Sequence, residues 1–470
     1  MVSDFEPTID RLLSLISSSP SSVYSEVRYQ MRSISEIHVT NGEVERVRDN
    51  VVSGCGIRVL VDGCWGFSST NDTTTTSLKS SMYDAISVAR VLGNSKKAKV
   101  RGLAECKLAK GVFRAKERGR LSDVGIERKV KDICEAEAQA RKHRGIRMAS
   151  CTYREIIDHK LLVTSDGAEA EIYDPKPEFA ITCLAGKGTE SVSSTDGVGI
   201  TGGWYDLFSK KSNTDYAEEV ADKAYRLLDA KYPYGERTTL ILDPGMVGLL
   251  AHEAIGHMAE ADFVLSGSVL KGKIGRTVAS DLVTLVDNGH SAFAKNAAGT
   301  IAVDDEGVYA GRTSIIKDGV LESFLHSRES AMVFDSEPTG NARAFSYTDE
   351  PLIRMRNTYI EPKSDNLADM IKETGHGFLV KGARNGQADA NGEFMFGSQE
   401  VYLVENGEVK QIMRGTSISG NAFEVLQSVD MVGDSFEYGI GTGYCGKYQP
   451  AKVDGGGPYL RCSAIIGGTQ

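Results

Sequence analysis

Two histidines and one glutamate, His252, Glu253 and His257, lie in a short apolar stretch that follows a predicted buried strand over residues 238–242. Neutral imidazoles are good zinc ligands, and an adjacent carboxylate can accept a proton from a metal-activated water. An Asp-Pro pair at 243–244 is typical of the N-cap and first position of a helix. The sequence therefore predicts a strand, a tight turn and a buried helix that holds the candidate ligands rigidly.

The spacing of the histidines differs from the familiar H-E-x-x-H pattern, because His252 and His257 are five positions apart instead of four. At about 100° per residue, a regular α-helix would place them about 140° apart, too far to bind one ion. A π-bulge would return them to one face, and such bulges are frequent at functional sites. Gly256 is the residue that best tolerates this distortion. The alternative is a core helix that carries these residues by chance.

A catalytic zinc site usually has three protein ligands and one open position, so a third ligand is expected from another part of the chain. Cys445 is the best candidate, because flanking glycines allow close backbone approach and Lys447 would favour the thiolate. Most free cysteines, however, are small core residues. The competing candidates are Cys462 and, more weakly, His290, His326 and His376.

Several ordered motifs resemble the TldD/PmbA family of metallopeptidases, and in particular its zinc-bearing TldD-type branch. Residues 252–262 resemble the family's H-E-A-x-G-H-x-x-E-x-D, and residues 54–70 resemble its G-x-G-x-R-V-L…G-x-W-G-F-A-S-T stretch. Further matches are found at 304–307, 340–343, 354–358, 392–396 and 466–469. The resemblance extends over nearly the whole chain.

The resemblance implies that His252, His257 and Cys445 bind zinc and that Glu253 is the general base. The chain departs from the family at one point. The family usually continues Cys-Gly-Lys-x-Gly-Gln, whereas residues 447–449 here read Lys-Tyr-Gln. The missing glycine leaves the path of this loop open, but not the ligand.

The function that follows is a zinc-dependent peptidase acting on unfolded or modified peptides, with a zinc-bound water activated by Glu253. The resemblance also implies a dimer, either of two copies or with a PmbA/TldE-like chain. One alternative is a peptide-binding subunit with structural zinc, active only with such a partner; a fourth ligand, Cys462 or Glu260, would favour it. A scaffold that merely inherits the fold is the other, but it would have no use for Glu253.

Composition limits the partners and the location. The chain has 54 basic and 64 acidic residues and a net charge of -10, which argues against a nucleic-acid surface. Eight cysteines without a close pairing pattern are typical of a reducing cytoplasm. No run approaches the ~20 apolar residues of a membrane helix, and the first residues lack a signal-peptide layout. The sequence predicts a cytoplasmic protein that binds neither nucleic acid nor membrane.

A length of 470 residues predicts two domains in an α+β fold. Residues 1–190 are expected to form an α+β domain with an antiparallel or mixed sheet, and 191–197 a linker. Residues 198–470 are expected to form a β-rich, barrel-like catalytic domain that carries the metal helix. Asn-Gly and Asp-Gly pairs at 41–42, 62–63, 166–167, 318–319 and 406–407 predict tight turns between strands.

Three other features are weaker candidates for substrate contact. Residues 386–396 can form one wall of the cleft, or simply a strand with a glycine-rich approach. Arg343 can hold a substrate carboxylate, but a structural salt bridge is the expected role. His326 is expected to be a core or surface histidine.

Overall fold

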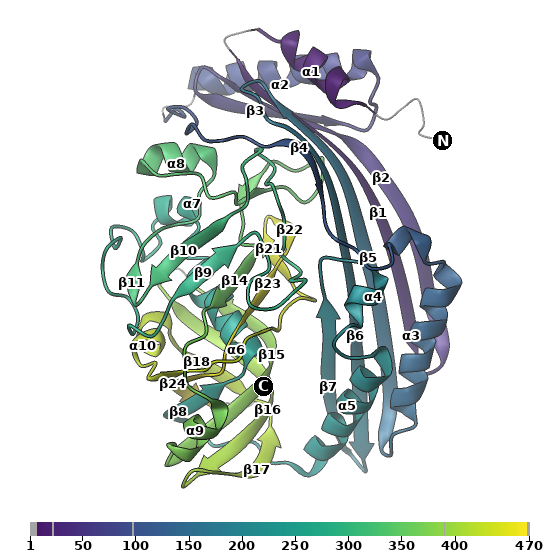
Figure 1. The fold of residues 1–470 in the computed structure, drawn as a ribbon, viewed down its shortest axis with the longest axis vertical. Helices are drawn as coiled ribbons and strands as arrows, with labels where there is room; N and C mark the ends of the chain where they lie inside the picture. The colour runs from purple at the N-terminus through teal and green to yellow at the C-terminus, as the bar shows by residue number, and fades with distance from the viewer. Residues whose placement is uncertain (1–6, 21–22, 96–97, 390, 468–470) are drawn as a thin grey trace.

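The computed structural model describes residues 7–20, 23–95, 98–389 and 391–467. Its first part is a long curved sheet that lies against a β-rich block, as Figure 1 shows. The sheet has the order β3-β2-β1-β5-β6-β4, and β7 pairs with β6. Because β4 runs parallel to β6 and the other pairs are antiparallel, the sheet is mixed. Its strands are β1 (Tyr24–Thr40), β2 (Glu43–Val61), β3 (Cys64–Thr70), β4 (Lys110–Arg114), β5 (Ile146–Thr164), β6 (Glu169–Lys187) and β7 (Glu190–Gly199).

Turn chemistry sets the hairpins of this sheet. Asn41 and Asp62 both adopt φ of 50°, each followed by a glycine with positive φ, between β1 and β2 and between β2 and β3. This left-handed conformation suits Asn, Asp and Gly, so the predicted hairpins are confirmed. Long strands joined by such turns give the sheet its extended curved surface.

Helices cover one face of the sheet at both ends. α2 packs on β2 and β3, whereas α3 and α5 pack on each other and on β5 and β6. The opposite face of the sheet points toward the β-rich block (Figure 1). The helical segments of this part are α1 (Ile9–Ser17), α2 (Thr75–Ser95), η1 (Leu121–Asp123), α3 (Ile126–Arg141), α4 (Trp204–Leu207), α5 (Asn213–Arg226) and η2 (Leu227–Asp229).

The predicted linker at 191–197 is wrong, because these residues lie in β7 and pair with β6. The ladder runs from the Glu178–Gly199 pair to the Lys187–Glu190 pair. Backbone hydrogen bonds of a half-exposed edge strand do not require apolar side chains, so its serine-rich sequence resembles a loop. The division into domains at 1–190 and 198–470 stays a prediction; α5, within the second range, packs on the first sheet.

The C-terminal part contains a closed barrel of five strands, which confirms the expected α+β fold with a barrel-like block. The barrel order is β15-β8-β24-β18-β16, and pairing of β15 with β16 closes it. β17 and β19 extend it at β16 and β24. These strands are β8 (Glu236–Leu242), β15 (His376–Ala388), β16 (Glu393–Glu405), β17 (Glu408–Arg414), β18 (Ser417–Asn421), β19 (Met431–Val432) and β24 (Leu460–Ile466).

A second sheet, of order β11-β10-β9-β14-β23-β20, lies beside the barrel, and two short hairpins complete the block. Its strands are β9 (Leu285–Asn288), β10 (Arg312–Lys317), β11 (Val320–Leu321), β14 (Asn357–Ile360), β20 (Glu437–Tyr438) and β23 (Asp454–Gly457). The hairpins are β12 (Ala342–Arg343) with β13 (Leu352–Ile353), and β21 (Tyr444–Lys447) with β22 (Gln449–Lys452). The helices are α6 (Pro244–Leu249), the π-helix η3 (Leu250–Gly256), α7 (Ala261–Leu265), α8 (Arg328–Phe334), α9 (Leu367–Lys372) and α10 (Ala422–Gln427).

α6 is the central helix of this block and packs against both β15 and β23. Met246, Val247 and Leu250 are buried in the largest apolar core. A Cβ on Gly248 would lie 2.5 Å from the backbone of Gly455, so helix and strand cross in direct contact only because this residue is glycine. The close contact between α6 and β23 therefore fixes the position of the helix that carries His252 and His257. Among the described residues, no helix has both the length and the apolar character needed to cross a bilayer.

Candidate metal centre

The metal helix begins and bends as its sequence predicts. Asp243 caps it, accepting a hydrogen bond from the backbone N–H of Met246 at 2.8 Å, and Pro244 occupies the first position. Residues Leu250–Gly256 then form a π-helix, and the backbone N–H of His257 donates to the carbonyl of His252 at 3.2 Å. This i→i+5 bond confirms the predicted π-bulge. It turns a spacing of five into one helical turn.

The structure brings His252, His257 and Cys445 together. One ligand atom from each lies within 4.8 Å of the others, and no other such group of His, Cys, Asp and Glu occurs among the described residues. Cys445 Sγ is 3.2 Å from His257 Nε2, and the imidazole rings meet edge to face at 5.1 Å. A sulfur and a nitrogen ligand on one tetrahedral zinc ion would be about 3.6 Å apart, given the usual zinc–sulfur and zinc–nitrogen distances. The 3.2 Å between Cys445 Sγ and His257 Nε2 is close to this value.

The donor set fits zinc in its chemistry. Two imidazole nitrogens and one thiolate are borderline-soft ligands, which favour zinc over magnesium or calcium. His252 is 2% exposed, and its Nδ1 is buried without a hydrogen-bond partner among the described residues. A core histidine ordinarily has both nitrogens satisfied. The orphaned nitrogen therefore favours a ligand role over two histidines placed by chance.

The thiolate form of Cys445 is favoured by the histidines and not by Lys447. Burial by itself raises the pKa of Cys445, but hydrogen bonds and charge from His252 and His257 outweigh burial and lower this pKa to about 5. The expectation that Lys447 lowers it is wrong, because its ammonium group is engaged elsewhere. Lys447 Nζ donates to a carboxylate oxygen of Glu260 at 2.8 Å.

Lys447 instead locks the cysteine hairpin onto the helix that follows the π-turn. Besides Glu260, its Nζ contacts the carboxylate of Asp262 at 2.8 Å and the carbonyl of Ile353 at 3.0 Å. The Lys447 side chain is only 4% exposed, and that of Glu260 is fully buried. A buried, well-bonded ion pair of this kind fixes register between segments distant in sequence. It holds Cys445, two residues earlier, beside the histidines.

Glu260 supports His257 from the far side of the ring. Its Oε2 lies 3.3 Å from His257 Nδ1, while His257 Nε2 faces Cys445. Burial tends to lower the pKa of His257, but the charge of Glu260 and the contacts with Cys445 outweigh burial and raise this pKa. A carboxylate on the second nitrogen typically orients a metal-binding imidazole. This supporting role of Glu260 differs from the ligand role considered above, and its spacing three residues after His257 is the sequence signal for it.

Glu253 lies beside the cluster, and the rival fourth ligands do not join it. Its carboxylate is 3.8 Å from His257 Nε2, and its side chain is 22% exposed. Cys462 is buried in β24, where burial raises its pKa to about 12. Neither Cys462 nor Glu260 belongs to the group of close ligand atoms found in the described residues. An open coordination position is therefore compatible with the geometry.

The loop that departs from the family pattern is a tight hairpin with one residue at its tip. Tyr448 joins β21 to β22 with φ of 59° and is 98% exposed. Arg354, fully buried, donates from its guanidinium to the carbonyls of Cys445 and Gln449, one on each strand. The hairpin therefore reaches the histidines without the missing glycine.

His326 is a core histidine, as expected. It is 1% exposed, its Nδ1 lies 3.1 Å from the hydroxyl of Ser330, and it packs against Phe324 and Phe334. Burial lowers its pKa to about 4. His290 and His376 also lie outside the group of close ligand atoms, His376 pairing with Glu236 at 2.9 Å.

We expect His326 to make stability depend on pH. Between its folded pKa of about 4 and the unfolded value of about 6.5, only the unfolded chain binds the proton. The free energy of unfolding therefore has its full value, as far as His326 is concerned, above about pH 6.5, and it decreases as pH falls toward 4. From pH 7 to 5 the parent should lose about 2 kcal/mol more than His326→Gln in urea unfolding. The exposed-site control His376→Gln should lose as much as the parent; equal losses in all three would contradict this role.

Comparison with known proteins identifies the family. Three family models match the chain: PmbA/TldA metallopeptidase domain 1 over residues 25–91, the central domain over 119–228 and the C-terminal domain over 235–467. A metalloprotease of Methanothermobacter thermautotrophicus is 31% identical over 95% of this chain and 96% of its own length. A protein of Saccharolobus solfataricus named zinc metalloprotease TldD homolog is 28% identical over 95% of this chain and 96% of its own length.

The fold comparison agrees. The crystal structure of TldE from Thermococcus kodakarensis superposes with a TM-score of 0.74 at 19% identity, covering 98% of this chain and 100% of that one. At this identity the likeness concerns the fold alone. The family models over the N-terminal, central and C-terminal parts, with the 31% identical metalloprotease, show that the chain is a metallopeptidase and belongs to the PmbA/TldD family.

Proposed function

We propose that this chain is a zinc-dependent peptidase in which His252, His257 and Cys445 hold the metal and Glu253 is the general base. The observation that carries the proposal is the convergence of the two imidazoles and one thiolate around one point, with Glu253 next to it. Bound zinc would polarise the scissile carbonyl and lower the pKa of the attacking water.

The protein groups then supply the proton transfers. Glu253 accepts a proton from the attacking water and returns it to the amine that leaves when the peptide C–N bond breaks. Glu260 keeps the His257 ring oriented, with its Oε2 3.3 Å from Nδ1. Because a thiolate donates more charge than an imidazole or carboxylate ligand, we expect modest activity on peptides that are poorly positioned.

The proposed substrates are unfolded or modified peptides. Of the segment 386–396, residues 386–389 and 391–396 lie in the β15–β16 hairpin, which packs against the π-helix, and residue 390 is outside the described residues. An open surface pocket of about 330 Å³ extends along this hairpin and is lined by Gly386, Gln387 and Met395 among others. A peptide captured by main-chain bonding at such strands would be accepted with little regard to sequence. The cytoplasmic location suggested by cysteine usage remains a prediction.

A second candidate is a subunit that binds peptide and is active only in an assembly with a PmbA/TldE-like chain. The likeness of this fold to that of TldE over nearly the whole chain supports it, since related chains with one fold often form paired assemblies. A dimer of two identical copies is the other possibility. In either case the metal ligands would come from this chain.

The test is zinc content by elemental analysis and hydrolysis of an unfolded polypeptide, measured on the parent and on Cys445→Ala. We expect about one zinc per parent chain, and loss of zinc and of hydrolysis together in the variant. Cys462→Ala, a matched buried thiol outside the site, should keep both. Unchanged zinc in Cys445→Ala would remove Cys445 from the site. Zinc without hydrolysis in the parent would favour the partner-dependent subunit.

A further inference from the structure

The candidate metal centre is assembled from two separate pieces of the chain. His252 and His257 lie on the π-helix η3 and at its C-terminal end, whereas Cys445 lies on the hairpin formed by β21 and β22. The contacts that fix the hairpin relative to the helix therefore also fix the thiolate relative to the two imidazoles.

Met355 provides a fixed point beside the histidines. It is fully buried, and its Sδ lies 2.1 Å from the position that a Cβ on Gly256 would occupy. Because Gly256 directly precedes His257, the Met355 side chain packs against the turn that carries this ligand. The strand β14, which begins two residues after Met355, also contacts the π-helix.

Arg343 ties this fixed point to the cysteine hairpin. Its Nη1 donates to the carbonyl of Met355 at 2.6 Å, and its Nη2 donates to the carbonyl of Lys452 at 2.7 Å. Lys452 is the cross-strand partner of Tyr444, the residue before Cys445. Because a guanidinium group is planar and rigid, the two bonds set the separation of the two carbonyls.

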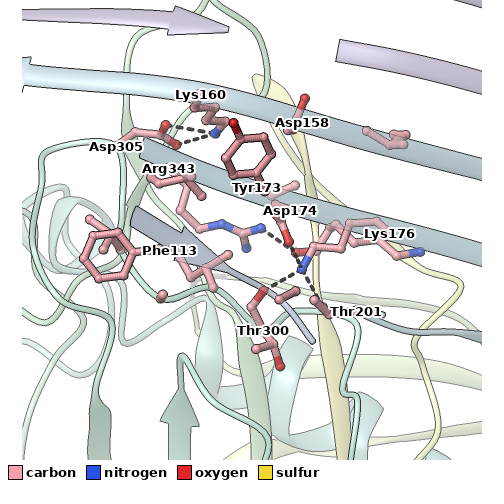
Figure 2. Close-up of a pocket in the computed structure, with 18 of the residues that line it drawn as sticks. Phe113, Asp158, Lys160, Tyr173, Asp174, Lys176, Thr201, Thr300, Asp305 and Arg343 are labelled. Carbon is pink, nitrogen blue, oxygen red and sulfur yellow. Dashed lines mark hydrogen bonds and ion pairs between the residues drawn. The ribbon is translucent and has the colours of Figure 1, made fainter. Parts of the chain in front are cut away.

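The guanidinium of Arg343 forms no ion pair among the described residues, so the structural salt bridge expected from sequence is wrong. Arg343 borders a cavity of about 300 Å³ between the curved sheet and the C-terminal block, where Figure 2 shows its guanidinium pointing toward Asp174. Burial, followed by repulsion from Arg354, lowers the pKa of Arg343 to about 10, although the charges of Asp174 and Asp305 act in the opposite direction. The group is therefore charged at neutral pH, and its bonds are made to backbone carbonyls.

We propose that Arg343 is a positioning residue of the metal centre, which holds Cys445 close enough to His252 and His257 for the three to share one zinc ion. The inference rests on the zinc site of the proposed function. Arg354 holds the two strands of the hairpin to each other, whereas Arg343 holds the hairpin to the segment that packs on the π-helix. Residues that orient metal ligands without binding the metal typically change metal affinity by about 10–100-fold when they are replaced.

Arg343→Lys tests this role, because it keeps the charge but removes the planar fork that holds both carbonyls. We expect the zinc dissociation constant of the full chain, measured by chelator competition, to rise at least about tenfold. The matched control is Arg414→Lys. Arg414 donates to the carbonyls of Leu227 at 3.3 Å and Leu228 at 2.9 Å, outside the metal centre, so this variant should bind zinc as the parent does. Unchanged zinc affinity in Arg343→Lys, or an equal loss in Arg414→Lys, would overturn the proposal.

Arg343→Gln is a second variant that does not depend on how a lysine settles at this position. Since Arg343 has no ion-pair partner in the described part of the chain, the change leaves no buried carboxylate without its counter-ion. The variant should therefore remain folded, as judged by circular dichroism, and should weaken zinc binding at least as much as Arg343→Lys. A folded Arg343→Gln chain with the zinc affinity of the parent would contradict the positioning role.

Cobalt(II) bound in place of zinc reports on the thiolate itself, because coordination by sulfur gives a charge-transfer absorption in the near ultraviolet. At saturating cobalt we expect this absorption to be weaker in Arg343→Lys than in the parent, and unchanged in Arg414→Lys. An unchanged absorption in Arg343→Lys would mean that the thiolate keeps its position without Arg343, and the proposal would be wrong.

The parent protein separates this inference from the proposed function on which it rests. If the parent binds no zinc, both are wrong. If the parent binds about one zinc per chain and Arg343→Lys binds it equally well, the metal centre stands and only the positioning role of Arg343 is wrong.

Discussion

Glu253→Gln is expected to lower the turnover of peptide hydrolysis about a thousandfold while leaving zinc bound. Glutamine has the shape of glutamate but cannot accept the proton of the attacking water. Glu253 is also outside the group formed by His252, His257 and Cys445, so its charge is not required to hold the metal. The measurement is kcat on an unfolded polypeptide together with zinc content by elemental analysis.

Glu260→Gln separates this role from a purely electrostatic effect near the metal. Glu260 contacts His257 Nδ1 and Lys447 Nζ. Its loss should weaken zinc binding by about 10–100-fold, yet leave turnover at saturating zinc much closer to that of the parent. If Glu253→Gln binds zinc and keeps full turnover, Glu253 is not the general base.

The distorted helix could be predicted because its signals are local. The five-residue spacing of His252 and His257 is unusable on a regular α-helix, and Gly256 marks where the distortion is tolerated. Cys445, in contrast, was only the best of several candidates for the third ligand on its flanking glycines and Lys447, and the motif resemblance singled it out. The sequence around Cys445 does not indicate that its hairpin, nearly two hundred positions after His257, packs against the helix that carries the histidines.

The environment of Cys445 shows why nearby sequence can mislead. Lys447 lies two residues away on the same strand, which suggested that it stabilises the thiolate. In the fold, its partners are Glu260 and Asp262, and the histidines stabilise the thiolate instead. The ion pairs of Lys447 with residues distant in sequence therefore determine its role. The same holds for β7, whose polar sequence reads as a linker until β6 supplies its hydrogen-bond partners.

The motif at residues 354–358 has a structural role in the described geometry. Arg354 holds both strands of the cysteine hairpin. Arg356 and Asp287 form an ion pair at 2.7 Å in which both side chains are 0% exposed. Asp287 also accepts the backbone N–H of Arg356 at 2.7 Å and the hydroxyl of Thr358 at 3.0 Å. This pair joins β9 to the start of β14.

Arg356→Met should lower the free energy of unfolding by about 3–5 kcal/mol, because it leaves the Asp287 carboxylate buried without its counter-ion. The measurement is urea unfolding followed by tryptophan fluorescence and circular dichroism. The matched control is Arg312→Met, whose guanidinium pairs with Glu361 at 2.9 Å but whose side chain is 45% exposed. An exposed pair of this kind should contribute less than about 1 kcal/mol.

The double variant Arg356→Met/Asp287→Asn distinguishes a lost attraction from a stranded charge. If the main cost of Arg356→Met is the unpaired carboxylate, neutralising Asp287 should recover part of the stability, and the two changes will not add. Additive losses would instead mean that each residue acts through its separate bonds to the backbone, such as that from Arg356 to the Thr339 carbonyl at 3.0 Å. Removing either Arg356 or Asp287 by itself leaves the other charge buried without its partner, which destabilises the sheet. That would explain why both side chains of this pair are fully buried in the C-terminal block.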